Sequence, residues 1–357
     1  MSGDGTLRDR LARRIRAEGP LSLADYMEAA LWDKRHGYYA TRAPIGAKGD
    51  FITAPEVSQV FGELIGLWCA DLWRRMGAPD PVLVCELGPG NGTLMADFLR
   101  ATRILPAFRR AIRLHLVERS PALRAIQEKT LAGENAAWHE PVDQLPPGPL
   151  LLVANEFLDA LPIRQFERRK GGWFERRIGL DAAGNLVFVL DPALTTQDLP
   201  DWPEGSIAEI CPEAREIARA LGGRLKDEGG AALLIDYGYF PSAPGDSFQA
   251  VSRHRHFDPL KDPGGADLTA HVDFAALAAA ATQAGARVWG PVTQGDFLSA
   301  LGLAERVRKL SAGKPARESQ AIEAACRRLI ELAQMGSLFK ALALTHPALA
   351  APAGFGP

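Results

Sequence analysis

The stretch Glu86-Leu-Gly-Pro-Gly-Asn-Gly92 decides the fold. It follows the apolar run Pro81–Cys85 and precedes a segment from Thr93 to about Thr102 with helical character. A short apolar run that ends in a glycine-rich turn is typical of a buried parallel strand. Glycines let the backbone turn sharply and approach a ligand closely. The sequence therefore predicts a strand–loop–helix unit with a ligand at its turn.

The loop differs from the common nucleotide-binding loops. Gly88, Gly90 and Gly92 alternate, but Thr93 stands where the dinucleotide fingerprint has its third glycine. No Gly-Lys-Ser/Thr follows, so the loop is not of the P-loop type. Glu86, two residues before the first glycine, would repel a pyrophosphate and attract the ammonium and sulfonium charges of S-adenosylmethionine. We therefore predict S-adenosylmethionine, rather than NAD, as the cofactor.

Strand-like and helix-like segments alternate through much of the chain. Apolar residues recur with a helical period from Val57 to Trp73, which predicts a helix with a buried face. Further apolar runs that read as buried strands are Ile112–Val117, Leu150–Ala154 and Gly230–Ile235. This order predicts the α/β class, with a doubly wound, mostly parallel, Rossmann-like sheet and helical N-terminal and inserted additions.

The length of 357 residues allows one large α/β domain with additions. We expect residues 1–75 to form an N-terminal helical region that borders the active site, and residues 76–357 to form the main domain. Two stretches look inserted. Residues 163–200 carry short β-like runs and a basic cluster, and residues 239–270 are loop-like and rich in proline, as in an active-site lid.

Composition sets limits on partners and compartment. The net charge of −2 provides no overall electrostatic field that would attract nucleic acid. The basic cluster in residues 163–200 is interleaved with Glu167 and Glu175, so we expect this cluster to form a solvated face or a protein-docking surface. No apolar run is long enough to insert into a membrane. The four cysteines form no C-x-x-C pair, and we predict no metal. The segment Met1–Arg16 lacks an apolar signal core, so we expect a cytoplasmic protein in a bacterium, or a mitochondrial matrix protein in a eukaryote.

Polar residues at predicted strand ends are candidate cofactor contacts. Glu118 ends the second strand, where an acid accepts hydrogen bonds from ribose hydroxyls. Asp143 follows the third strand, where an adenine contact would fall. Thr53 and Glu56 have the spacing of a capping box at a helix start. The loop before it contains Gly49 and Asp50, and a cationic group of the ligand would be favoured beside Asp50.

Three polar residues directly follow the apolar run Leu150–Ala154. Burial of polar side chains such as those of Asn155, Glu156 and Asp159 costs free energy unless they face a cleft. Carboxylates there would hold a cationic guanidinium bidentately and orient one nitrogen for methyl transfer. We name these three residues as candidate catalytic residues, with capping of the next helix as their alternative role. Asp236 ends another strand, and we expect it at the same cleft. His271 is either a base, a lid contact or a structural residue.

At this point the chain resembles a known family, the MidA-like class I methyltransferases. The resemblance extends from about Leu21 to Pro347 and rests on several motifs in order: Gly49-Asp-Phe-Ile-Thr-Ala-Pro-Glu56, Phe61-Gly-Glu63, Glu86–Thr93, Leu116-Val-Glu118, Asn155-Glu-Phe157, Asp236-Tyr-Gly238 and Ala266–Phe274. It implies a seven-stranded class I sheet. It also implies that Gly88, Gly90, Gly92 and Glu118 bind the cofactor, that Gly49, Asp50, Thr53 and Pro55 border it, and that Asn155 and Glu156 border the acceptor.

The family includes a mitochondrial complex I assembly factor that is a protein arginine methyltransferase. The resemblance therefore implies symmetric dimethylation of an arginine on the 49-kDa-type subunit of respiratory complex I, and a homodimer is one candidate assembly. Two other functions stay open: a methyltransferase for a small molecule or another acceptor, and a non-catalytic S-adenosylmethionine-binding assembly protein. A dehydrogenase is disfavoured by Glu86 and Thr93.

Overall fold

The main sheet confirms an α/β fold and is mixed. The computed structural model describes residues 5–42, 46, 52–252 and 255–356. Seven strands follow one path in this order: β15 (Arg287–Thr293), β16 (Phe339–Thr345), β10 (Gly230–Tyr239), β5 (Leu150–Asn155), β2 (Val82–Leu87), β3 (Ile112–Val117) and β4 (Ala137–His139). β16 runs antiparallel to both of its neighbours, and the strands from β10 to β4 are parallel. An eighth strand, β14 (Val272–Asp273), pairs with the end of β10.

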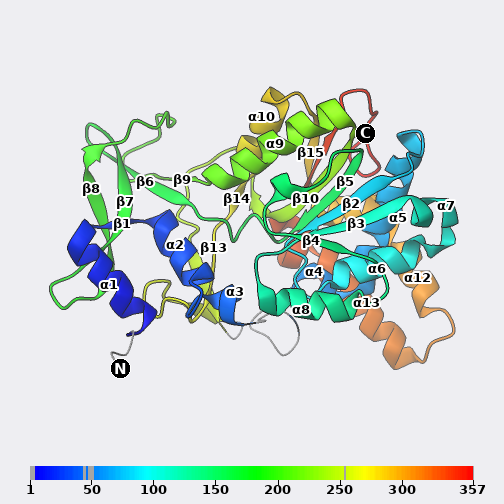
Figure 1. Ribbon diagram of the computed structural model, residues 1–357, viewed down its shortest axis with the longest axis horizontal. Coiled ribbons are helices and arrows are strands. Elements are labelled where there is room, and N and C mark those ends of the chain that lie inside the picture. Colours follow the sequence, from blue (N-terminus) through cyan, green and yellow to red (C-terminus); the bar gives the residue numbers. More distant parts are fainter. Residues whose placement is uncertain (1–4, 43–45, 47–51, 253–254, 357) are drawn as a thin grey trace.

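Helices cover both faces of this sheet (Figure 1). One face carries α5 (Gln59–Arg75), α6 (Thr93–Ala101), α7 (Pro106–Ala111), α11 (Gln294–Ala300), α12 (Leu303–Ser311) and α13 (Ala316–Ile330). The other carries α9 (Pro212–Glu228) and α10 (Phe274–Gln283). α8 (Pro121–Thr130) lies between β3 and β4 in the chain. The doubly wound arrangement predicted from the order of segments is present in this part of the molecule.

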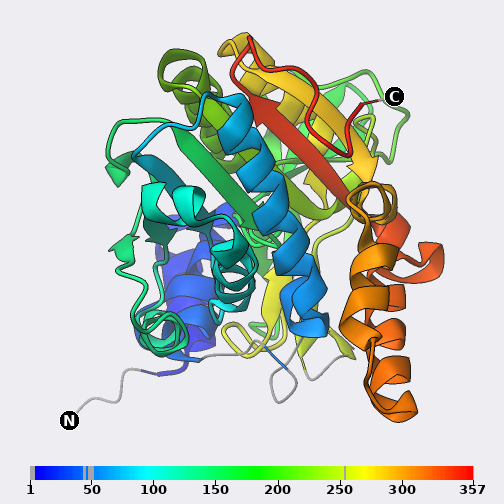
Figure 2. The same ribbon diagram turned by 90° about the vertical axis from the view of Figure 1, so that its right-hand side faces the viewer.

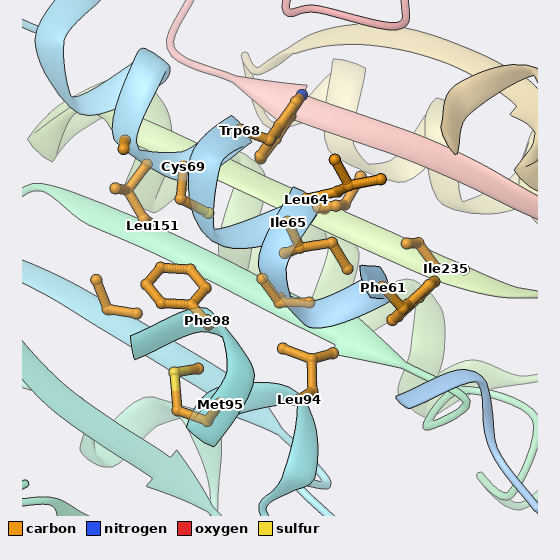
Figure 3. Close-up of a cluster of buried hydrophobic side chains, with 14 of the residues drawn as sticks. Phe61, Leu64, Ile65, Trp68, Cys69, Leu94, Met95, Phe98, Leu151 and Ile235 are labelled. Carbon is orange, nitrogen blue, oxygen red and sulfur yellow. The ribbon is translucent and has the colours of Figure 1, made fainter. Parts of the chain in front are cut away.

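The helical period between Val57 and Trp73 predicted α5 correctly. Its apolar face packs against α6 and against side chains of the sheet such as Leu151 and Ile235, as Figure 3 shows. Gly62 and Gly66 allow this packing to be close, because a Cβ on Gly62 would lie 2.7 Å from the Leu94 carbonyl oxygen. The predicted helix begins later than expected, since the chain forms a separate short helix, α4 (Ala54–Val57), and Ser58 then caps α5.

A second lobe lies at the left of Figure 1. Its five-stranded antiparallel sheet contains β1 (Leu21–Ser22), β7 (Gly172–Leu180), β6 (Arg164–Arg169), β9 (Ile207–Ile210) and β8 (Leu186–Leu194). A three-stranded sheet contains β11 (Gln249–Ser252), β12 (Arg255–Phe257) and β13 (Asp267–Thr269). Together with α1 (Leu7–Glu18), α2 (Leu23–Trp32) and α3 (Tyr38–Thr41), they enclose a hydrophobic core of their own.

This lobe differs from the expectation in two respects. The stretch 239–270 is not loop-like throughout, because it contains the three strands β11 to β13. The antiparallel strands that begin with β6 at Arg164 continue beyond residue 200, since β9 ends at Ile210. The sequence missed these elements because the strands are short and polar residues interrupt their alternation. Ser22 caps α2, since its hydroxyl accepts from the Asp25 N–H at 3.0 Å.

The basic cluster of the second lobe is neutralised within the lobe. Arg164 and Arg177 both pair with the buried Glu175, at 2.7 and 2.9 Å. Arg168 and Arg176 pair with acids on neighbouring loops.

Among the described residues, no helix combines the length and the apolar character needed to cross a bilayer.

Candidate active site

A cavity of about 410 Å³ lies at the carboxyl edge of the parallel strands. Ligand sites of soluble proteins have volumes of about 300–1,000 Å³, so the cavity has room for a cofactor-sized molecule. The predicted residues that line it are Thr53, Pro55, Glu86, Gly88, Gly90, Glu118, Asp143, Asn155 and Glu156. Gly92 and Asp159 are not among the described lining residues. Gly49 and Asp50 lie outside the described residues.

The glycine loop joins β2 to α6. Gly88, Gly90 and Gly92 have φ angles of 60°, 54° and 78°, a left-handed conformation that costs other residues energy. A Cβ on Gly88 would lie 2.7 Å from the ring of Phe157. Gly92 caps α6 rather than lining the cavity. The predicted unit of strand, loop and helix is therefore confirmed, with the loop backbone at the cavity wall.

Glu86 provides the cavity with a buried carboxylate. Its side chain is only 3% exposed, and its Oε2 has no hydrogen-bond partner among the described residues. Burial, together with the charge of Glu118, raises the pKa of Glu86 to about 8. A buried acceptor without a partner is costly unless a ligand satisfies it. The ammonium of S-adenosylmethionine supplies both the donor and the positive charge that this oxygen lacks, so these residues fit the predicted cofactor.

Glu118 is held rigidly at the end of β3. Its Oε1 accepts from the Ser120 N–H at 2.7 Å and its Oε2 accepts from Gln127 Nε2 at 2.9 Å. The same Gln127 nitrogen donates to the Gly90 carbonyl at 2.9 Å, which connects the acid to the glycine loop. The carboxylate is fixed in place and retains lone pairs for ribose hydroxyls. Gln127 was missed from the sequence because it lies in the middle of α8.

Arg119, next to Glu118, contacts residues of the second lobe. It pairs with Glu28 at 2.6 Å and lies over the ring of Trp32 at 4.6 Å. Trp32 in turn stacks on Tyr39 at 5.4 Å, and all three side chains line the cavity. The second lobe therefore contributes an aromatic wall. The sequence held no signal for it, because Trp32 ends α2 and Tyr39 lies in α3, both far from the glycine loop along the chain.

Glu156 stands at the end of β5 in a strained conformation. Its φ of 50° is rare for a residue with a side chain. The carboxylate accepts from the Ala54 N–H at 2.8 Å and from Asn155 Nδ2 at 3.1 Å. Burial raises the pKa of Glu156 to about 7, and the nearby charge of Asp159 adds to the increase. Asn155 Oδ1 is buried and has no hydrogen-bond partner in the described part of the chain.

The predicted capping box at Thr53 is wrong. The Thr53 side chain makes no cap hydrogen bond to α4. Glu56 instead accepts from Thr93 Oγ1 at 2.6 Å and from Asn91 Nδ2 at 3.2 Å. These bonds fasten α4 to the glycine loop, so that the Ala54 N–H is available to Glu156.

Asp159 and Asp236 lie behind the wall of the cavity. One Asp236 oxygen accepts from the N–H groups of Phe157, Leu158 and Asp159, at 3.1, 2.9 and 3.2 Å. Asp159 accepts from the Tyr237 hydroxyl. Burial raises the pKa of Asp159 to about 6 and that of Asp236 well above its ordinary value. Asp236 therefore holds the turn after β5 rather than facing the cleft, and Asp159 is directed toward Tyr237.

His271 also lies away from this cavity. The His271 ring packs edge-on against Tyr237, with ring centroids 5.5 Å apart. The backbone N–H of His271 donates to Ser247 Oγ at 2.8 Å. Burial lowers the pKa of the imidazole. The described lining residues of this cavity do not include it.

The cavity lining is strongly acidic. Arg119 is the one basic residue among the described lining residues, which include the acids Glu56, Glu86, Glu118, Glu140, Asp143, Glu156, Glu213 and Glu216. A cleft lined by one sign of charge concentrates ligands of the other sign. This cavity therefore favours cationic ligands. The described residues contain no group of three or more side chains suited to a metal ion.

Comparison with known proteins identifies the family. Residues 64–292 match the profile of a family of S-adenosyl-L-methionine-dependent methyltransferases. The chain belongs to this family. It is 35% identical to the mitochondrial protein arginine methyltransferase NDUFAF7 homolog of Drosophila melanogaster, over 98% of this chain and 87% of that protein. It is 37% identical to mitochondrial NDUFAF7 of Danio rerio, over 95% of this chain and 86% of that protein.

A solved structure supports the same assignment. A protein from Burkholderia thailandensis, determined with S-adenosyl-homocysteine bound, is 28% identical, with a TM-score of 0.85 over 98% of this chain and 94% of the other. The similarity thus includes the second lobe as well as the main sheet. This methyltransferase uses S-adenosylmethionine, as the glycine loop and Glu86 predicted, and the dehydrogenase alternative is set aside.

Proposed function

We propose that this methyltransferase modifies a protein arginine on the 49-kDa-type subunit of respiratory complex I and so aids assembly of the complex. The observation that carries the arginine proposal is the buried, oriented carboxylate of Glu156 in an acid-lined cavity. The relatives from fly and fish are named protein arginine methyltransferases and match nearly the whole chain.

The chemistry at the acceptor follows from Glu156. When bound, S-adenosylmethionine supplies an electrophilic methyl group on its sulfonium. The Glu156 carboxylate accepts hydrogen bonds from the guanidinium and turns one nitrogen toward that methyl. As the nitrogen–carbon bond forms and the sulfur–carbon bond breaks, the attacking nitrogen must lose a proton. Glu156, with a pKa raised to about 7 by burial, accepts it.

The other residues serve cofactor binding in this proposal. Glu86 holds the ammonium, the loop Gly88–Gly92 approaches the cofactor with its backbone, Glu118 holds the ribose and Asp143 borders the adenine. Thr53, Pro55, Gly49 and Asp50 border the cofactor from the N-terminal side. Asn155 orients the acceptor through its amide, and Asp159 acts through Tyr237 and the turn after β5.

Several broader assignments belong to the same proposal. The seven-strand path from β4 to β15 is the class I methyltransferase sheet, residues 76–357 form the methyltransferase domain, and residues 1–75 form the N-terminal region at its active site. The protein acts in the bacterial cytoplasm or, in a eukaryote, in the mitochondrial matrix; the animal relatives are named as mitochondrial proteins. A homodimer is the assembly to test first by light scattering.

Two experiments test the proposal. Purified protein is incubated with methyl-labelled S-adenosylmethionine and cell lysate, and we expect label in protein, recovered as methylarginine after hydrolysis. Label confined to a small-molecule fraction would instead support a different acceptor. Mass spectrometry of complex I from cells with and without the protein tests the substrate, and unchanged arginine methylation would contradict the complex I assignment. Full cellular function of the Glu156→Ala variant would favour a non-catalytic assembly role.

A further inference from the structure

Three large apolar side chains are exposed together at the edge of the main sheet. Phe240, which follows β10, is 50% exposed, and Leu338, which precedes β16, is 44% exposed. Because β16 runs antiparallel to β10, the end of one strand and the start of the other lie at the same edge. Leu332, in the segment between α13 and β16, is 75% exposed. We call Phe240, Leu332 and Leu338 the edge patch.

Hydrogen bonds hold the three segments of the edge patch together. The Lys340 ammonium donates to the carbonyls of Gly238 and Ser337, at 2.7 and 3.4 Å. The Ser337 hydroxyl donates to the Leu332 carbonyl at 2.6 Å. Beneath them the rings of Tyr237 and Phe339 are in contact, with centroids 5.4 Å apart. These bonds tie together the three backbone segments that carry Phe240, Leu332 and Leu338.

The edge patch lies at the same edge of the sheet as the acceptor half of the cavity, because β10 and β5 are parallel neighbours. Tyr237, three residues before Phe240, donates to Asp159, and Glu156 is hydrogen-bonded through its N–H to Ile235 on the same strand, at 2.9 Å. On the other side, α13 runs beside the start of α5, where Cys326 and Ser58 are in contact at 3.2 Å (Figure 2).

The charge of an exposed arginine gives a second link between the patch and Glu156. Arg328 lies in the last turn of α13, four residues before Leu332. Burial raises the pKa of Glu156, and the positive charge of Arg328 opposes that increase, which places the end of α13 within electrostatic reach of the carboxylate.

Single exposed apolar residues need no explanation, but a group beside a functional site marks a binding surface. Here the apolar group shares a sheet edge with an acid-lined cavity suited to one guanidinium. We infer that the edge patch binds the substrate polypeptide, through apolar side chains that flank the acceptor arginine in its sequence. This inference rests on the proposed arginine methyltransferase function. It adds a substrate preference that the cavity alone does not give, because free arginine would not reach the patch.

The test uses two synthetic peptides with one central arginine, identical except that the flanking positions carry leucine in one and serine in the other. Binding is measured by fluorescence anisotropy with S-adenosyl-homocysteine present, so that it does not depend on turnover. We expect the protein to bind the leucine peptide about tenfold more tightly, which corresponds to about 1.4 kcal/mol. The Leu332→Ser, Leu338→Ser double variant should lose this preference. Both side chains are substantially exposed, so the fold should tolerate the changes.

Ile104→Ser is the matched control, because Ile104 is 74% exposed and lies beyond the carboxyl end of α6, away from the glycine loop at its start. It should keep the preference. Equal binding of both peptides by the unaltered protein, or an unchanged preference in the double variant, would overturn the inference. Loss of a dimer in the double variant with peptide binding intact would assign the patch to a second copy instead and also overturn it. If the preference is present but methylarginine never forms, the proposed function fails and the docking surface stands.

Discussion

The two halves of the cavity are built in different ways. The main polar groups proposed to bind the cofactor, Glu86, the glycine loop and Glu118, come from one continuous unit, from β2 to the end of β3. The acceptor half is assembled from parts far apart in the sequence: Glu156 after β5, the Ala54 N–H of α4, and Asp236 and Tyr237 of β10. In the proposed function, the first half binds the cofactor with groups that the fold holds in place. The second half depends on long-range contacts that orient one strained residue.

This difference predicts that a change in one half should alter either cofactor binding or methyl transfer to the acceptor and leave the other intact. The largest effect should come from Glu156→Gln, which keeps the size of the side chain and removes its charge. We expect kcat for arginine methylation to fall at least about 100-fold, as for the loss of a preorganised electrostatic group. The affinity for S-adenosylmethionine, measured by calorimetry, should change less than about threefold, since the change lies outside the cofactor half.

Glu213→Gln is the control for that prediction, because Glu213 also lines the acidic cavity but belongs to α9. A comparable loss of kcat in both variants would show that general acidity matters and that Glu156 has no special role.

Gly88→Val should break the cofactor half. The new side chain must adopt a φ of 60° and its Cβ would lie 2.7 Å from the Phe157 ring. Left-handed strain and overpacking each cost about 1–3 kcal/mol, so cofactor affinity should fall about 100-fold. Gly133→Val, at a φ of 87° with no atom within 4 Å, shares the strain without the collision and should bind the cofactor normally. Equal binding by both variants would mean that the loop is not at the cofactor.

Glu86→Gln should weaken cofactor binding about tenfold, because the ammonium would lose a charge-assisted hydrogen bond. Calorimetry of the variant would measure this, and kcat at saturating cofactor should stay within about threefold. Unchanged affinity would show that the buried oxygen of Glu86 faces no cationic group of the ligand.

The pH dependence of cofactor binding gives a separate test of Glu86. Burial raises the pKa of this carboxyl to about 8, and the ionised form is the one that attracts the ammonium. Cofactor affinity should therefore fall as pH decreases below about 8, by at most about tenfold per pH unit for a single proton. Titrations across this range should show the slope in the natural protein and a flatter profile in Glu86→Gln. A flat profile in both would contradict the assignment.

Tyr237→Phe should have the smallest effect. It removes the hydroxyl that donates to Asp159 and leaves the ring packed against Phe339. We expect a loss of about three- to tenfold in kcat/KM for the acceptor, with a shifted pH profile and unchanged cofactor affinity. An unchanged pH profile would mean that Asp159 does not influence Glu156.

Sequence reasoning succeeded where the signal was local. The loop Glu86–Gly92, the acid at Glu118 and the helical period of α5 each reveal themselves within a short window, since a strand, a turn and a helix follow one another without long-range help. The order of these units predicted the α/β class. The antiparallel β16 and the paired strand β14 had no such signal, because strand direction depends on which neighbour a late segment finds.

The acceptor half shows where local patterns fail. Asn155, Glu156 and Asp159 share one short segment, yet the turn directs Glu156 to the cavity and Asp159 to Tyr237. Which carboxylate faces the ligand depends on the positive φ of Glu156 and on Asp236, 80 residues farther along. The same holds for Glu56, whose spacing imitates a capping box while its true partners are Thr93 and Asn91.

The most direct test of the division into two halves is a crystal structure of this protein with S-adenosyl-homocysteine bound. The account predicts the ligand ammonium within hydrogen-bond distance of Glu86, its ribose hydroxyls at Glu118, and its sulfur directed toward an uncovered Glu156. A ligand that covers Glu156, or that leaves the buried oxygen of Glu86 without a partner, would contradict it.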